Sequence, residues 1–168
     1  RAIEGFPEFP MDIDGAINQV WMKDFLWRIT EEVAESMEAY YGKDPIHQIE
    51  ELADSLHFMV EAMLAVGVEP IIPNLATIVA MHQNTQKDYI SCCLTVFFKA
   101  GMIGNTLKNK RWKQSQILTD VLKFRRLLNE TFVALIGAFV ASGCSAEDIF
   151  TFYFKKSEVN QFRIRSQY

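Results

Sequence analysis

Apolar residues recur at intervals of three and four over most of the chain, which is the spacing of an amphipathic α-helix. This pattern predicts a first helix from Ala16 to Tyr41, with Gly42 as its stop. A second helix is predicted from Pro45 to Gly67, with Asp44 as its N-terminal cap. Only a short turn separates the two, so we expect them to pack as antiparallel neighbours.

The rest of the chain also follows helical periodicity. Further helices are predicted from Leu75 to about Gly101 or beyond, from about Ser115 to Val140, and, as a shorter element, from Ser145 onward. No run alternates as a strand does, and no internal repeat or flexible linker is present. Residues 1–14, with prolines among phenylalanines, predict an extended N-terminal arm. We therefore expect an all-α bundle of about five main helices.

Composition narrows the class of protein. A length of 168 residues favours one domain, 1–168, and 49% hydrophobic with 23% charged residues is typical of a globular protein. A net charge of -4 leaves no broad basic surface, so we expect no nucleic-acid partner. The apolar runs at 89–104 and 131–143 are broken by Lys99 or too short to cross a bilayer, so we expect no membrane partner.

Cysteine usage bears on the compartment. The three cysteines are odd in number and lack metal-ligand spacing, which favours reduced thiols that pack in the core. The opening residues also lack the succession of basic, apolar and small residues of a secretory signal. We expect a cytoplasmic protein, or one in the host cytoplasm if its source is viral.

Two pairs of acidic residues stand across the first predicted turn. Glu32 and Glu35, and then Glu51 and Asp54, are each three residues apart and so occupy neighbouring positions on one helix. Glu35 and Glu51 each lie about 10 Å from the turn at 1.5 Å per residue, so antiparallel packing puts the two pairs level. A four-carboxylate cluster suits Mg²⁺ with retained water and phosphate oxygens. The alternative interpretation is a solvated acidic helix face.

The end of the chain concentrates basic residues among aromatic ones. If the last helix continues, Lys156, Asn160 and Arg163 share one face. Arg forms forked bonds to phosphate, Lys supplies a compact charge, and Asn adds an uncharged donor, so this face suits a polyphosphate. The alternative is a basic helix end that complements its own dipole or forms surface ion pairs.

Both motifs resemble one known group of enzymes. The segments EVAE and ELAD are similar to the Glu-x-x-Glu and Glu-x-x-Asp signature of the all-α nucleoside triphosphate pyrophosphohydrolases, the superfamily of MazG-like enzymes. The following SLHF resembles the dimeric all-α dUTPase version. The closing motif of dimeric dUTPases is resembled by Tyr153, Lys156, Asn160 and Arg163. Ile164 and Gln167 depart from it, since Gln and Gly are frequent at these positions.

The resemblance implies an all-α homodimer that uses Mg²⁺ to hydrolyse dUTP to dUMP and pyrophosphate. The aromatic arm and the abundant apolar helix surface also favour a homodimer. The resemblance further implies that the tail binds the phosphates and that metal binding and catalysis fall to Glu32, Glu35, Glu51 and Asp54. Either glutamate of the first pair is a candidate to polarise the attacking water. Alternatives are a dCTP or broader deoxynucleotide pyrophosphohydrolase and, in another class, a non-catalytic helical interaction protein.

The residues that recognise the base are not set by a motif. Gln19 and Asn18 are our candidates because an amide can pair with a pyrimidine edge, and a solvent-facing helix start is the alternative. The segment 105–112, NTLKNKRW, is a second basic and aromatic cluster, which we interpret as a solvated turn with a half-buried Trp rather than a ligand site. His47 and His57 flank the second acid pair and are interpreted as supporting or packing groups.

Overall fold

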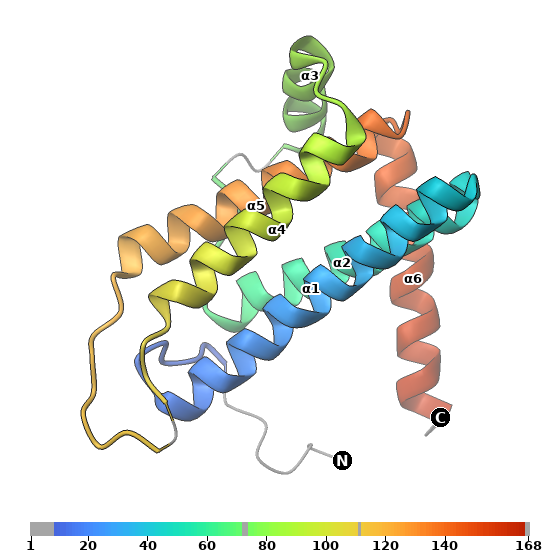
Figure 1. Cartoon of the computed structure of the whole chain (residues 1–168). Coiled ribbons are helices and arrows are strands. Elements are labelled where there is room, and N and C mark those ends of the chain that lie inside the picture. The colour runs from blue at the N-terminus through green and yellow to red at the C-terminus, as the bar shows by residue number, and fades with distance from the viewer. Residues whose placement is uncertain (1–8, 72–73, 111, 167–168) are drawn as a thin grey trace.

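The computed structural model describes residues 9–71, 74–110 and 112–166 (Figure 1). These ranges contain helices and connecting segments with no strand, which confirms the all-α prediction. The helices of the described chain are α1 (Ala16–Gly42), α2 (Pro45–Ala65), α3 (Leu75–Thr85), α4 (Tyr89–Thr106), α5 (Val121–Ala141) and α6 (Ala146–Ser166).

The first two helices begin and end close to the predicted boundaries. Lys43 adopts the left-handed conformation with φ 60° and ends α1. The Asp44 carboxylate accepts a hydrogen bond from the His47 N–H at 3.1 Å, and Pro45 occupies the first turn of α2. The turn is therefore tight, and Figure 1 shows α1 and α2 running side by side in opposite directions.

The prediction of one long third helix was wrong. Gln86 adopts a left-handed conformation with φ 48° and ends α3, and Asp88 caps α4 by accepting the Ser91 N–H at 2.9 Å. The next helix starts later than predicted because Asp120 is its cap, accepting the Lys123 N–H at 3.0 Å. The last helix has 21 residues and is as long as α5 instead of shorter.

The buried hydrophobic residues form one cluster to which every helix contributes. Helix α5 carries a continuous buried run at 134–139, because α2, α3 and α4 pack around it. Cys92, Cys93 and Cys144 are free and lie in this core, where burial raises the pKa of each thiol. This confirms the prediction that the cysteines pack in the core.

Only the end of the predicted N-terminal arm is described, since residues 1–8 lie outside the described ranges. Met11 is buried in the core cluster, and its N–H donates to the Ala65 carbonyl oxygen at 2.6 Å, at the end of α2. Within the described ranges no single helix has both the length and the apolar character needed to cross a membrane. The bent pair of Val121–Ala141 and Ala146–Arg163, at 109°, passes that test by length and composition.

Candidate metal and nucleotide site

Three of the four acids predicted from the sequence meet across the seam between α1 and α2. Glu32, Glu35 and Glu51 each place one carboxylate oxygen within 4.8 Å of the other two. Glu32 and Glu51 are partly buried, and Glu35 is exposed. The antiparallel packing of the two helices brings the pairs level, as the outward count from the turn predicts. Three carboxylates so close together form an all-oxygen donor set that fits a hard divalent cation.

The electrostatics of Glu32 reflect this crowding. Burial is the largest cause that raises the pKa of Glu32, and a hydrogen bond with Glu51 adds to it. The negative charges of Asp54, Glu51 and Glu35 raise it further, and together these effects bring the pKa to about 8. Near neutral pH the cluster therefore retains a proton that a bound cation would displace.

Asp54 belongs to the same cluster by charge but has a partner of its own. Its carboxylate forms an ion pair with the Lys156 ammonium of α6. One turn along both helices, the rings of His57 and Tyr153 stack with centroids 4.3 Å apart, and His57 Nε2 lies 3.2 Å from the Tyr153 carbonyl oxygen. Residue numbers rise along α2 as they fall along α6 in these two contacts, and Figure 1 shows α6 running at a steep angle to α2.

The other predicted tail residues follow along α6. Asn160, one turn beyond Lys156, is partly buried, and Arg163, two turns beyond, is exposed. The structure thus brings Lys156 into contact with Asp54. Asn160 and Arg163 lie further along the same helix.

His47 supports the second acid pair, as its position in the sequence suggested. Its Nδ1 lies 3.1 Å from Glu51 Oε1, and the side chain is half exposed. The contact spans four residues of α2, a spacing at which side chains meet on one helix face. His47 therefore holds one oxygen of Glu51 from the solvent side.

Two buried serines fix the seam beneath the acids and were not identified from the sequence. Ser36, next to Glu35, donates to the Gln48 carbonyl oxygen at 2.7 Å. Ser55, next to Asp54, donates to the Ile29 carbonyl oxygen at 3.1 Å. Both bonds join α1 to α2 in the dry interior, so they fix the register that the carboxylates need. The available signal was a small polar residue within each apolar stripe.

A cavity of about 500 Å³ lies between α2 and α6, beside the ion pair of Asp54 and Lys156. Its volume is within the range of small-ligand pockets, about 300–1,000 Å³. Apolar side chains from both helices and the charged groups Glu50, Lys155 and Lys156 line it; the apolar residues are Ile46, Ala53, Phe152 and Val159. This cavity adjoins the acid cluster through Lys156.

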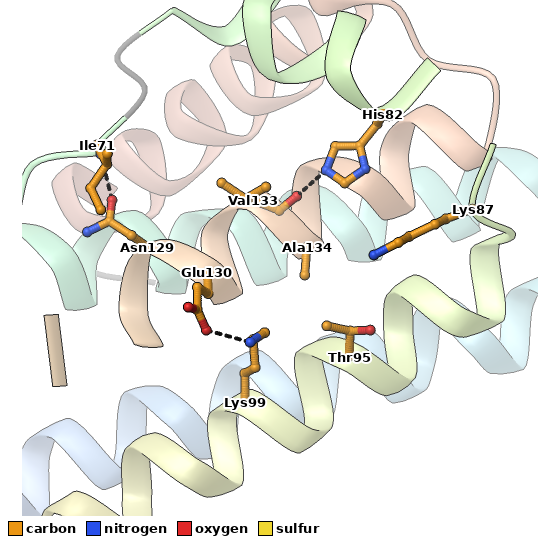
Figure 2. Close-up of a pocket in the computed structure, with 9 residues that line it drawn as sticks. All are labelled: Ile71, His82, Lys87, Thr95, Lys99, Asn129, Glu130, Val133 and Ala134. Carbon is orange, nitrogen blue, oxygen red and sulfur yellow. Dashed lines mark hydrogen bonds and ion pairs between the residues drawn. The ribbon is translucent and has the colours of Figure 1, made fainter. Parts of the chain in front are cut away.

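A second cavity, of about 310 Å³, lies between α3, α4 and α5 (Figure 2). It shares no lining residue with the acid cluster. Its polar groups are largely engaged within the chain, since Lys99 pairs with Glu130 at 2.5 Å and His82 Nε2 lies 2.8 Å from the Val133 carbonyl oxygen. Lys87 reaches into the cavity without an acidic cluster beside it, so this cavity lacks the donors that a metal–nucleotide complex requires.

Gln19, a candidate for base recognition, has a side chain that is engaged within the chain. Gln19 is fully buried near the start of α1, about 20 Å along the helix from Glu32. Its amide contacts three separate backbone or side-chain groups within the chain. The alternative of a solvent-facing helix start is wrong for Gln19, because its side chain is buried. Asn18 donates to the Asp12 carbonyl oxygen at 2.9 Å, an exposed contact that orders the turn before α1.

The segment 105–112 covers the last two residues of α4 and the start of the connection that follows, and its Trp is not half-buried as interpreted. Trp112 is 77% exposed, and the Lys110 ammonium lies 5.6 Å from its ring centroid. Arg111 lies outside the described residues. Lys108 and Lys110 act on Lys23 of α1, whose pKa is lowered first by burial and then by their charges. The segment therefore lies near α1 in space.

The fold and the acid pairs together are those expected of the all-α nucleoside triphosphate pyrophosphohydrolases. A family model described as dUTPase matches residues 21–168, which is most of the chain. The chain belongs to the dimeric all-α dUTPase family, and its activity is that of a dUTP diphosphatase, a hydrolase of nucleotide metabolism. No curated protein and no solved structure matches it.

Proposed function

We propose that this dUTP diphosphatase depends on Mg²⁺ held by Glu32, Glu35, Glu51 and Asp54. The observation that supports this most strongly is the approach of one oxygen from each of the first three residues to within 4.8 Å. Carboxylates this close repel one another unless a cation or a proton stands between them. Mg²⁺ prefers such oxygen ligands and commonly shares its coordination with phosphate oxygens.

The chemistry follows from where the charged groups lie. A bound Mg²⁺ would orient the triphosphate and offset the charge that develops on the leaving pyrophosphate. Glu32 and Glu35 are the two carboxylates proposed to accept the proton of the attacking water. Lys156 and Arg163 of α6 offset phosphate charge, and Asn160 between them positions an oxygen of the substrate.

The cavity between α2 and α6 is our proposed place for the nucleoside. It adjoins Lys156, so a triphosphate held by that residue directs its sugar and base into this space. Phe152 and Val159 supply apolar walls from α6, and Ile46 supplies one from α2. Tyr153, a candidate substrate-binding residue of the tail, stacks on His57 and so also holds α6 against α2.

The test is a charge-removing substitution in the cluster with a matched control. Glu51→Gln keeps the shape of the side chain, and we expect it to lower pyrophosphate release from dUTP by about 100-fold or more while the far-ultraviolet circular dichroism is unchanged. Glu38→Gln on the exposed part of α1 should retain activity. Mg²⁺-dependent turnover that persists in Glu51→Gln would refute the proposed site. Assays with dUTP, dCTP, dTTP and dATP establish the substrate range.

We also propose that the chain forms a homodimer in the cytoplasm. Leu94 and Phe98 lie four residues apart on one face of α4 and are 57% and 66% exposed. An exposed apolar patch of this kind is typical of a protein–protein interface. The three free, buried cysteines fit a reducing compartment. Light scattering should give twice the 19.3 kDa chain mass, and Phe98→Glu should shift the protein toward monomer. A monomer at working concentrations would exclude the dimer.

A further inference from the structure

In this structure Lys156 forms an ion pair with one acid of the cluster. Its ammonium pairs with the Asp54 carboxylate, and the two side chains are only 27% and 15% exposed. A partly buried ion pair is screened less by water than a surface pair, so separating its two charges costs more free energy. Within the described residues, it is the one Lys or Arg paired with any of Glu32, Glu35, Glu51 and Asp54.

The two proposed roles of this pair compete while the pair is intact. Asp54 Oδ2 is shared if it contacts both a cation and Lys156, and an N–H that Lys156 donates to Asp54 is not available to a phosphate. We propose that Lys156 is an exchangeable counter-ion, which holds Asp54 when no divalent cation is bound and passes to a phosphate of the nucleotide when the cation takes the carboxylate. This inference rests on the proposed function.

The neighbouring contacts allow the exchange without undocking α6. His57 and Tyr153 stack one turn closer to the start of α6, so the helix stays attached when the Lys156 side chain leaves Asp54. Beyond Lys156 the helix is less enclosed, since Val159 is 44% and Phe162 is 69% exposed. The lysine stem and the 500 Å³ cavity that it lines provide the room for its ammonium to turn from Asp54 toward a bound triphosphate.

The exchange predicts that Lys156 opposes cation binding in the absence of nucleotide. Mn²⁺ binding to the full chain is measured by calorimetry or electron paramagnetic resonance for the unsubstituted protein, Lys156→Met and Lys155→Met. Lys155→Met removes the same charge from the neighbouring, exposed position. We expect Lys156→Met to bind Mn²⁺ about three- to tenfold more tightly than the unsubstituted protein, and Lys155→Met to stay within about twofold. Lys156→Gln, which keeps a polar end, serves if Lys156→Met fails to fold.

The reciprocal arm uses the nucleotide without metal. In EDTA, Asp54→Asn releases Lys156 and should bind a non-hydrolysable dUTP analogue more tightly than Glu35→Gln, which removes an equal charge from an acid that Lys156 does not contact. Equal Mn²⁺ affinities of the Lys156 and Lys155 variants would overturn the exchange and leave the metal site standing. Absence of Mn²⁺ binding by the unsubstituted protein would overturn both the exchange and the proposed function. Equal analogue binding by the two acid variants would also contradict the exchange.

Discussion

Replacing Gln19 with leucine separates a structural role from a role in substrate recognition. The Gln19 amide nitrogen donates to the Ile13 carbonyl oxygen at 2.8 Å and to Thr119 Oγ1 at 3.2 Å. Its amide oxygen accepts the Asn109 N–H at 2.8 Å. One buried side chain thus ties α1 to the segment before it and to both ends of the connection between α4 and α5.

The cost of the substitution follows from the groups left behind. Leucine fills a similar volume but leaves the buried Asn109 N–H without its acceptor, and the Ile13 carbonyl loses a donor. An unsatisfied buried polar group costs about 1–3 kcal/mol, so we expect a total loss of about 2–4 kcal/mol in the free energy of unfolding. For a chain of this length, each kcal/mol shifts Tm by about 2–4 °C, which predicts a decrease of roughly 5–15 °C.

The assay combines urea and thermal unfolding with steady-state kinetics on dUTP. Asn18→Ala is the control, because its exposed contact with the Asp12 carbonyl oxygen should be worth less than about 1 kcal/mol. At a temperature where Gln19→Leu is still folded, KM for dUTP should change little. An unchanged unfolding midpoint together with a large rise in KM would refute the structural role and return Gln19 to base recognition.

Three further predictions test the core, the acid cluster and the attachment of α6. Gly137→Ala should cost about 1–3 kcal/mol in urea unfolding, since its Cβ would lie 2.6 Å from the His82 ring, and adding His82→Ala should recover most of the loss. In EDTA, the free energy of unfolding should fall by about 1–2 kcal/mol as pH rises from 4.5 to 8, a magnitude that is already discounted for solvent screening. The cause is that Glu32 binds a proton more tightly in the folded chain than in the unfolded one. Glu32→Gln should lack this decline. His57→Leu should remove the stack on Tyr153 and speed amide hydrogen exchange in α6, and unchanged exchange would contradict that role.

The features that could be predicted from the sequence are those set by residue spacing within one helix or across one short turn. Glu35 and Glu51 could be placed level because a helix fixes positions along its own length and the turn between the two helices is short. The break at Asp88 was missed, although an Asp directly before an apolar helical run is a readable helix start. Gln19 could not be read from sequence, since its function depends on residues about 100 positions away, which only tertiary packing brings near.

The acid cluster shows how a fold can carry a local conflict. Crowding of Glu32, Glu35 and Glu51 opposes folding, whereas the bonds of Ser36 and Ser55 and the apolar seam beneath hold α1 against α2 regardless. A proton on Glu32 and the Lys156 ammonium beside Asp54 reduce the remaining repulsion among the carboxylates. Both are monovalent, and we propose that one divalent ion replaces them together. Under that proposal, a site whose seam is fixed by Ser36 and Ser55 and whose charges can be exchanged is preorganised for Mg²⁺.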